Sequence, residues 1–386
     1  MKAIYLLLIA AATCIYTVDA QLPPTLWTHD FAGATQFADI TETADGRLLA
    51  LGTNRNQNLW LLCLDGRGDT LWSRTYIQSG ANRPERILHP TDNRIVMASV
   101  VGNATVGYMA WLLCTDAAGT ELWRKTGAPQ GSNPSTDVGF DSNGNLWWLT
   151  IQQGAPNTTR LSRLDLEGAE HAQHIYSDTH DFEGRTLRVL ADGSVALSGS
   201  RKKAGMSEVW TMRIDAEGKE VWRLFQPQAS AINYAECICS MPDNTLLVAG
   251  TTGVVMNPDA APEDQVVDRN VMVSKIDPTG KLIWTKQHDR EGCETGNALV
   301  VTAQGDILVA GGCETSYTGT LGPWLLLLNR QGEKVDEQVD RFRFMGDRAS
   351  RIIQTSDGGF VITGPGRVAA DSRRQLGWIK KVGPLP

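Results

Sequence analysis

The sequence predicts an all-β chain folded as a seven-bladed β-propeller of four-stranded antiparallel blades. The first observation is a phrase that recurs roughly every 50 residues: an apolar strand, an Asp-x-x-Gly turn and a return strand that carries a Trp. Asn58–Tyr76 is its clearest copy. A period of this length indicates stacked units, each burying its apolar face against the next. Further copies have turns that begin at Asp116, Asp165, Asp215, Asp277 and Asn329.

The second observation is a set of short polar turns between apolar runs, one upstream of each phrase. Asp-Gly and Asn-Gly turns between such runs indicate β-hairpins, because these residues tolerate the positive φ that the turn needs. In all seven units an aliphatic residue stands six positions before the second turn residue, and a small residue stands six positions after it. The aliphatic anchors are Ile40, Ile87, Val138, Leu187, Ile238, Leu299 and Ile352. Each unit therefore has strands a, b, c and d, and the units begin near Phe37, Pro84, Thr136, Gly184, Ala235, Gly296 and Ala349.

The third observation is the placement of Trp. Ten of the twelve tryptophans fall at two positions of the repeat, and only Trp147 and Trp148 lie elsewhere. We interpret the ten as packing between neighbouring sheets, since a large aromatic usually carries core packing; an aromatic platform for carbohydrate is the alternative. Those on strand c are Trp60, Trp111, Trp210, Trp324 and Trp378, and those on strand d are Trp27, Trp72, Trp123, Trp222 and Trp284.

The last unit lacks a strand d, because its strand c at Gly377–Val382 almost reaches the end of the sequence. An orphan strand stands at the other end, at Thr25–Phe31, and its Trp27 fits the missing strand-d position. We expect this N-terminal strand to complete the last blade. Closing the ring removes exposed sheet edges that would otherwise pair with other chains.

The repeat resembles that of secreted bacterial β-propellers of the Bacteroidetes type, and more distantly that of quinoprotein and BamB-like propellers. The shared features are the Asp-Gly turn, the Trp-Leu-x-x-x-Asp strand and the Gly-x-x-x-Trp return, from Thr25 to Val382. In the quinoprotein-like group the Gly usually follows the Asp by one residue more, and eight blades are typical. The resemblance implies a fold and not an activity, because this architecture carries many functions.

Residues 1–20 have the pattern of a secretory signal peptide: Lys2, the apolar run Ile4–Ala12 and a small-residue cleavage site before Gln21. The mature chain, 21–386, is then one propeller domain that is exported to the periplasm, the outer membrane or the exterior. Cys14 leaves lipidation open, although the residues before it fit a lipobox poorly. No later stretch is long enough to span a membrane. The formal net charge of −7 disfavours a nucleic-acid partner.

The expected function is that of a secreted or envelope-associated binding or scaffolding module, either a monomer or a subunit of an envelope complex. A protein is the expected partner, bound through the face with the variable b–c and d–a loops, because function concentrates on variable loops held by a rigid scaffold. A carbohydrate-binding or polysaccharide-active propeller is the alternative. No catalytic residues, resident cofactor or metal are expected; His171 and His174 lie three apart on a strand and so point to opposite faces.

The mouth of the central channel is a candidate binding site, lined by the residue at the start of each strand a. Such a ring could bind a polar or anionic ligand, or it could simply be hydrated. Besides Pro134, the ring comprises Gln36, Arg83, Glu183, Tyr234, Thr295 and Arg348.

The b–c loop of the fifth unit, expected to run from Thr251 to Asn270, is a second candidate site. Its carboxylates could hold Ca²⁺, which takes six to eight oxygen ligands, or the loop could be solvated acid without a ligand. These carboxylates are Asp259, Glu263, Asp264 and Asp268.

Cleavage at Ala20 would leave six cysteines, too few for a disulfide framework in a chain of this length. Cys293 and Cys313 flank one predicted hairpin, so they are the candidate disulfide pair.

Overall fold

The computed structural model describes residues 21–385 except 104–106, 131–133, 204–205, 227–231, 258, 260–266, 291, 315–320, 341–347 and 368–374. In this part of the chain there is no helix, and so none long and apolar enough to cross a membrane. The predicted signal peptide and Cys14 lie outside the described residues.

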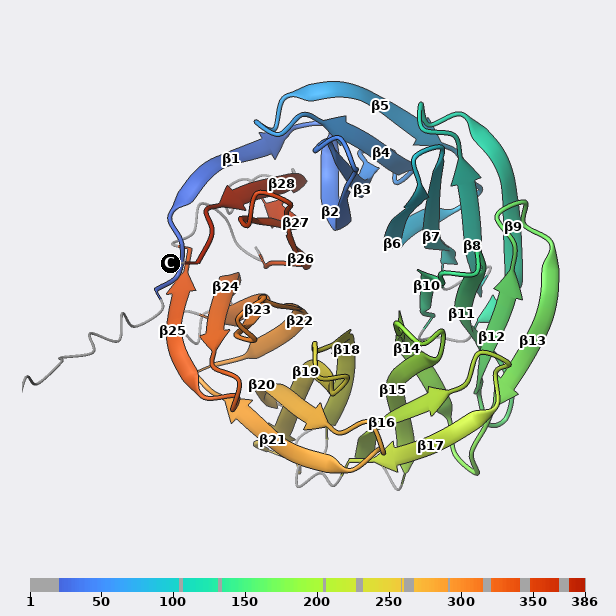
Figure 1. Ribbon diagram of the computed structural model, residues 1–386, viewed down its shortest axis with the longest axis vertical. Helices are drawn as coiled ribbons and strands as arrows, with labels where there is room; N and C mark the ends of the chain where they lie inside the picture. Colours follow the sequence, from blue (N-terminus) through green and yellow to red (C-terminus); the bar gives the residue numbers. More distant parts are fainter. Residues whose placement is uncertain are drawn as a thin grey trace, which may run out of the picture.

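The described residues form twenty-eight strands in seven four-stranded antiparallel sheets around a central opening, which confirms the predicted seven-bladed propeller (Figure 1). The innermost strands, one per blade, are β2, β6, β10, β14, β18, β22 and β26. In chain order the strands are β1 (Thr25–Phe31), β2 (Ala34–Glu42), β3 (Leu48–Asn54), β4 (Leu59–Leu64), β5 (Thr70–Tyr76), β6 (Ala81–Thr91), β7 (Arg94–Asn103), β8 (Gly107–Thr115), β9 (Glu121–Gln130), β10 (Thr136–Phe140), β11 (Leu146–Gln152), β12 (Thr158–Leu164), β13 (Glu170–Tyr176), β14 (Phe182–Val189), β15 (Val195–Lys203), β16 (Met206–Ile214), β17 (Glu220–Phe225), β18 (Ile232–Ser240), β19 (Leu246–Val255), β20 (Val267–Ile276), β21 (Leu282–His288), β22 (Glu294–Val301), β23 (Ile307–Glu314), β24 (Leu321–Leu328), β25 (Lys334–Val339), β26 (Arg351–Gln354), β27 (Phe360–Arg367) and β28 (Gln375–Val382).

The N-terminal strand closes the ring as predicted. β1 pairs with β28 and becomes the outer strand of the seventh blade, whose order is β1-β28-β27-β26. Figure 1 shows the first and last strands side by side at this seam. The blade is thus built from both ends of the chain, so neither end of the sheet series is left as an open edge.

The Asp-x-x-Gly phrase forms the turns between strands c and d. At Asp65 the side-chain Oδ1 accepts the N–H groups of Arg67 and Asp69, and the Gly68 N–H donates to the Asp65 carbonyl oxygen. A short acceptor side chain at the first position therefore satisfies the turn's own backbone donors. The same pattern recurs at Asp116, Asp165, Asp215, Asp277 and Asn329.

The glycine of each c–d turn is also a docking point for the preceding blade. Gly280 has a φ of 89°, and a Cβ there would lie 2.6 Å from Cδ2 of Trp222 in the neighbouring blade. The Trp222 indole N–H donates to the Pro278 carbonyl oxygen at 3.0 Å. Only glycine allows both this backbone conformation and this close approach. The equivalent pairs are Gly68 on Trp27, Gly119 on Trp72, Gly168 on Trp123, Gly332 on Trp284 and, where strand d lacks a Trp, Gly218 on His174.

One junction differs, because the seventh blade has no c–d turn. The residue of the sixth blade at the Trp position is Asp336, and its Oδ2 accepts the Leu22 backbone N–H at 2.9 Å. A carboxylate acceptor therefore holds the N-terminal segment where the other junctions have an aromatic ring on a glycine.

The hydrophobic core is divided among the blade junctions. The described residues form seven buried clusters, and each combines side chains from two adjacent blades. Trp147 and Trp148, the two outside the repeat positions, are adjacent in β11 and so point to opposite faces, one into each flanking cluster. This placement supports the interpretation of the tryptophans as packing residues.

Candidate functional site

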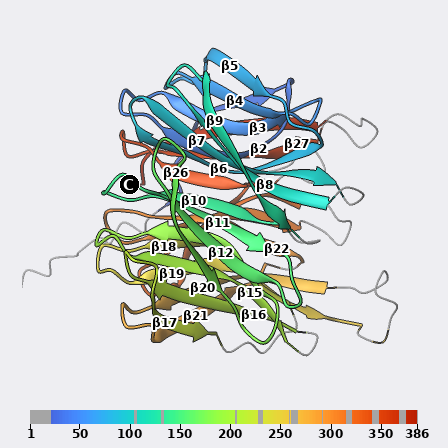
Figure 2. The same ribbon diagram turned by 90° about the vertical axis from the view of Figure 1, so that its right-hand side faces the viewer.

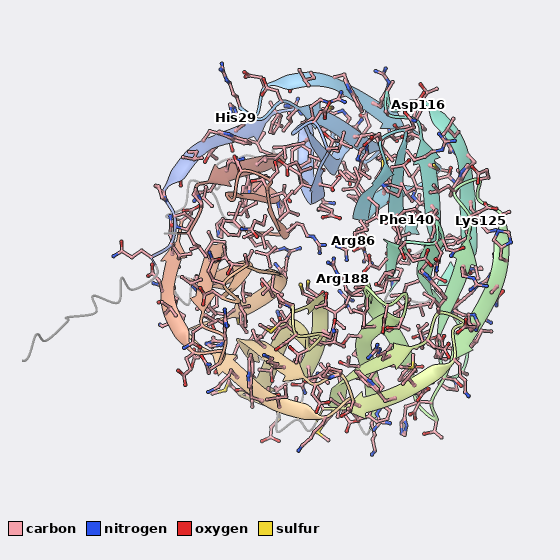
Figure 3. All side chains as sticks on the ribbon, viewed as in Figure 1. His29, Arg86, Asp116, Lys125, Phe140 and Arg188 are labelled. Carbon is pink, nitrogen blue, oxygen red and sulfur yellow. The ribbon has the colours of Figure 1, made fainter. Side chains whose placement is uncertain are left out.

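The central channel contains two cavities separated by a constriction. The loop-face cavity, about 390 Å³, lies at the starts of the inner strands, toward the b–c and d–a connections. The turn-face cavity, about 470 Å³, lies at their ends, toward the short a–b turns. Figure 3 labels Arg86 and Arg188 at the central opening. Arg86 lines both cavities, whereas Arg188 lines only the second.

Bulges in the inner strands give the loop-face cavity much of its lining. Each bulge inserts one residue that has no partner in the neighbouring strand, and the bulge can turn the side chain of this residue toward the channel. The inserted residues are Ala38, Glu85, Arg185, Glu236 and Asn297, and all five line the cavity. In contrast, the register of β10 with β11 shows no such shift.

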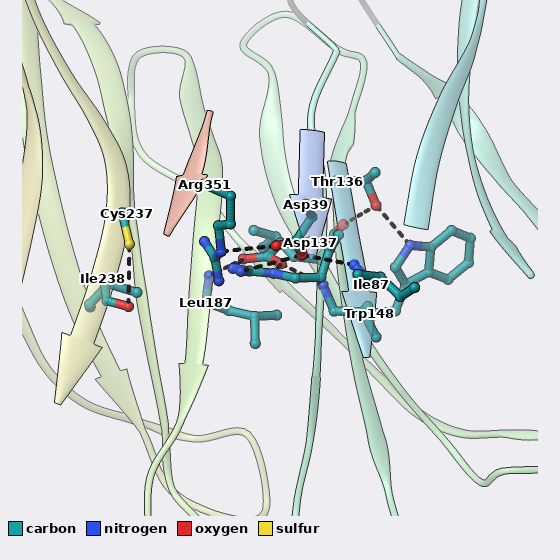
Figure 4. Close-up of polar contacts among 12 residues, drawn as sticks. Asp39, Ile87, Thr136, Asp137, Trp148, Leu187, Cys237, Ile238 and Arg351 are labelled. Atoms are coloured by element: carbon teal, nitrogen blue, oxygen red, sulfur yellow. Dashed lines mark hydrogen bonds and ion pairs between the residues drawn. The ribbon is translucent and has the colours of Figure 1, made fainter. Parts of the chain in front are cut away.

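The constriction is formed by the residues immediately before the aliphatic anchors. On four consecutive blades they alternate in charge: Arg351, Asp39, Arg86 and Asp137. Figure 4 labels Arg351, Asp39 and Asp137 close together at this constriction. Nε and Nη2 of Arg86 donate to the two Asp137 carboxylate oxygens at 2.6 and 2.9 Å. Asp39 lies between the two arginines, with Oδ1 3.0 Å from Arg351 Nε and Oδ2 3.9 Å from Arg86 Nη1.

The two aspartates also tie adjacent blades together. Asp39 Oδ2 accepts the backbone N–H of Ile87 on the second blade at 2.8 Å. Asp137 Oδ2 accepts that of Leu187 on the fourth blade, also at 2.8 Å. Burial of the Asp39 carboxyl raises its pKa to about 6, although Arg86 and the backbone donors oppose the shift. Burial opposes the charge of Arg86 as well, but the Asp137 and Asp39 carboxylates raise the pKa of its guanidinium.

Around the remaining three blades the same position carries small, uncharged side chains, namely Thr186, Cys237 and Ala298. The constriction is therefore charged on one half of the ring and uncharged on the other. Below it the turn-face cavity has a largely apolar wall that includes five of the aliphatic anchors and Phe140. Its polar lining residues are Asp39, Arg86 and Arg351 of the constriction together with Thr41, His89 and Arg188.

Four of the six residues predicted at the channel mouth line the loop-face cavity: Gln36, Arg83, Thr295 and Arg348. Ligand binding by them stays a prediction. Glu183 and Tyr234 are not among its lining residues. Glu183 is buried, with Oε1 accepting from Asn157 Nδ2 at 2.9 Å, so this carboxylate of the fourth blade is directed toward the b–c turn of the third blade.

The sequence prediction missed the bulge residues because it aligned the seven units only by their distance from the aliphatic anchor. A bulge changes which side chain of the inner strand faces the channel. The available signal was a polar residue two positions before the aliphatic anchor, as at Glu85, Arg185, Glu236 and Asn297. A bulge in the inner strand breaks the regular alternation of side chains, so that this polar residue can also face the channel.

The acidic loop of the fifth unit is shorter than predicted. β19 continues through Val255 and β20 resumes at Val267, so Thr251 and Asn270 are ladder residues. Beyond Gly253, β19 pairs with β20 alone. The amino-acid composition of the segment does not show that this two-stranded hairpin extends past the rest of the sheet. Asp268 lies in β20 opposite Val254, and Asp259 is exposed.

Glu263 and Asp264 lie outside the described residues, so calcium binding by the four carboxylates stays a prediction. Elsewhere in the described ranges no three His, Cys, Asp or Glu side chains gather as a metal site would require. His171 is exposed and bonds Asp165, whereas His174 packs beneath Gly218, in line with their opposite directions on β13.

The predicted Cys293–Cys313 disulfide stays a prediction. In the ladder of β22 and β23, the residue opposite Cys313 is Glu294, one position after Cys293. The Cys293 side chain, on the other side of the strand, donates from Sγ to the Val267 carbonyl oxygen at 2.9 Å.

Comparisons with known proteins place the chain by its fold alone. No protein-family model and no curated protein matches the sequence. Among solved structures, BBS1N in complex with ARL6DN is similar at a TM-score of 0.54 and 9% identity, over 94% of this chain and 97% of that one. A Dyadobacter fermentans protein of unknown function has a TM-score of 0.52 at 9% identity, over 93% and 99%.

Puromycin hydrolase is similar at a TM-score of 0.52 and 14% identity, over 87% of this chain but only 51% of the hydrolase. At these identities the likeness extends to the fold and not to the activity. The chain is a seven-bladed β-propeller, and its channel defines the candidate site.

Proposed function

We propose that this propeller is an exported or envelope-associated binding module that binds a protein through its loop face. The loop face is the surface at the b–c hairpin ends and d–a connections. Support comes from exposed apolar side chains at the b–c hairpin ends of the second, fourth and fifth blades. These are Met109, Met206, Val254 and Met256, which are 39%, 46%, 50% and 62% exposed.

The positions of these side chains distinguish the loop face from the opposite one. The hairpins that carry them are long: β7–β8, β15–β16 and β19–β20 have strands of nine or ten residues. The a–b and c–d turns are short and polar. Figure 2 shows the hairpins projecting from one side of the ring. Methionine is flexible and polarizable, which suits adaptable contacts with a partner.

The other exposed aliphatic residues are mostly single side chains on the outer strands, such as Leu71, Val221 and Ile283. They recur once per blade and are separated around the rim, so they are the scattered surface residues normal for a soluble domain. They provide a matched control for the loop face.

A protein partner is favoured over carbohydrate because no aromatic side chain in the described ranges is largely exposed. The tryptophans that could have stacked on sugars are packed between blades. BBS1N, a propeller of similar fold, was crystallised with a protein, ARL6DN. The export half of the proposal rests on the signal-peptide pattern of residues 1–20.

The test is a crosslinking pull-down from the native envelope fraction, followed by titration of the purified partner. Three baits are compared: the unaltered chain, a first variant and a control variant. The first variant has Met206, Val254 and Met256 changed to Ser. The control variant has Leu71, Val221 and Ile283 changed to Ser. The proposal expects one partner that binds the unaltered chain and the control alike and is lost from the first variant. Equal binding to both variants would refute the loop-face assignment. N-terminal sequencing of the native protein tests export, with Gln21 as the expected first residue.

A further inference from the structure

The loop-face cavity has an excess of positive charge in a chain whose formal net charge is −7. Five arginines line it, against three carboxylates: Arg83, Arg86, Arg185, Arg348 and Arg351 face Glu85, Asp137 and Glu236. Adding Asp39 at the constriction gives four carboxylates, which still leaves one unbalanced guanidinium. A concave site of one sign concentrates ligands of the opposite sign.

Four of the five arginines are neutralised within the protein. Arg83 Nε bonds Glu85 at 2.6 Å, and its Nη2 donates to the Pro134 carbonyl oxygen. Arg185 Nη2 lies 3.1 Å from Glu236 Oε2. Arg86 and Arg351 are held by the aspartates of the constriction, as described above.

Arg348 is the exception: its side chain is exposed and has no carboxylate partner among the described residues. A guanidinium in a concave wall with its donors unused is suited to a ligand carboxylate, which it can bind in bidentate fashion.

A second unused group lies beside Arg348. Oγ1 of Thr295 is buried and has no hydrogen-bond partner within the described part of the chain. A Cβ placed on Gly312 would lie 3.5 Å from this oxygen and 3.0 Å from Arg348 Cβ, so the two side chains adjoin the same glycine. A buried hydroxyl without a partner is unfavourable, and it becomes satisfied when a ligand donates to it or accepts from it.

The rest of the lining is polar as well, including the amide side chains of Gln36 and Asn297 and the hydroxyl of Ser350. The cavity of about 390 Å³ falls in the size range of small-molecule sites, roughly 300–1,000 Å³. The ligand must therefore be small, anionic and rich in hydrogen-bonding groups.

We propose that the loop-face cavity binds a small organic carboxylate that also carries hydroxyl groups, of the sugar-acid class. The ligand carboxylate lies on Arg348, and the Thr295 hydroxyl bonds an adjacent ligand oxygen. This small-molecule site is separate from the protein-binding surface at the hairpin ends, so either proposal can fail alone.

The test is isothermal titration calorimetry of the full mature chain with D-glucuronate, D-galacturonate, D-glucose and inorganic phosphate. The proposal expects saturable binding of at least one uronate, about tenfold or more tighter than phosphate, and no measurable binding of glucose. Absence of uronate binding, or phosphate binding of equal strength, would overturn it.

Two variants and a control locate the site. Arg348→Gln should weaken uronate binding by about tenfold or more, since it removes a charge-assisted contact. Thr295→Val should weaken binding severalfold without lowering the melting temperature, because it deletes a hydroxyl that has no partner. Arg67→Gln removes an equal charge from an exposed c–d turn and should leave affinity unchanged. Unchanged affinity in both cavity variants, or an equal loss in the control, would place the ligand elsewhere.

Discussion

Glu294 should make the protein less stable as the pH rises. This first residue of β22 is fully buried, and neither carboxylate oxygen has a hydrogen-bond partner in the described ranges. Burial raises its pKa from 4.5 to about 7, and the nearby Arg290 offsets only part of the effect. The folded state thus prefers the protonated carboxyl more strongly than the unfolded chain does. The stabilising contribution is complete below pH 4.5 and is lost as the pH rises through 7.

The magnitude follows from the difference in pKa between the two states. One pKa unit corresponds to about 1.4 kcal/mol, so the shift amounts to about 3 kcal/mol of unfolding free energy. Glu294→Gln keeps the shape of the side chain but cannot ionise. The stability of the variant relative to the unaltered chain should therefore increase by about 3 kcal/mol from acidic to alkaline pH.

Urea denaturation followed by Trp fluorescence, repeated from pH 4.5 to 8, measures this difference. Glu217→Gln, at an exposed turn residue, is the matched control and should give a curve parallel to that of the unaltered chain. Parallel curves for Glu294→Gln as well would show that the buried carboxyl does not titrate as reasoned.

Three further predictions concern how the ring is held together. Deletion of β1 should lower the melting temperature strongly, because it removes the outer strand of the last blade; an unchanged melting curve would contradict closure by this strand. Arg86→Ala should destabilise the fold by about 3–5 kcal/mol in chemical denaturation, since it leaves Asp137 buried without its partner, and a loss below about 1 kcal/mol would refute that role. Gly280→Ala should cost more than Gly46→Ala in the same assay, because both glycines have positive φ but only the first would collide with Trp222; equal costs would exclude the collision.

The blades could be derived from the sequence because their signals are local. Gly68, three positions after Asp65 and four before Trp72, has a positive φ because of turn chemistry that a few neighbouring residues determine. Even the closing strand was identifiable, since Trp27 has the position that the missing strand d required.

The lining of the channel was less accessible, because it depends on backbone irregularities. Glu183 matches the start of its strand by count, yet its carboxylate bonds Asn157 of the neighbouring blade, while the inserted Arg185 lines the cavity. Register matters in the same way at Cys313, whose partner in the ladder is Glu294, one position after Cys293. In a strand, a register shift of one residue moves each side chain to the opposite face of the sheet. Small errors in predicted register therefore affect the prediction of a site more than the prediction of a fold.

The hydrogen bond between Leu22 and Asp336 has a consequence for how the protein responds to a pulling force. At five junctions a Trp side chain packs on the glycine of the next blade's c–d turn, and at one more His174 does so. At the remaining junction, between the sixth and seventh blades, Asp336 instead accepts one hydrogen bond from the Leu22 backbone N–H. Tension applied through the segment that precedes β1 would therefore break this hydrogen bond first, while the glycine contacts of the other junctions remain in place.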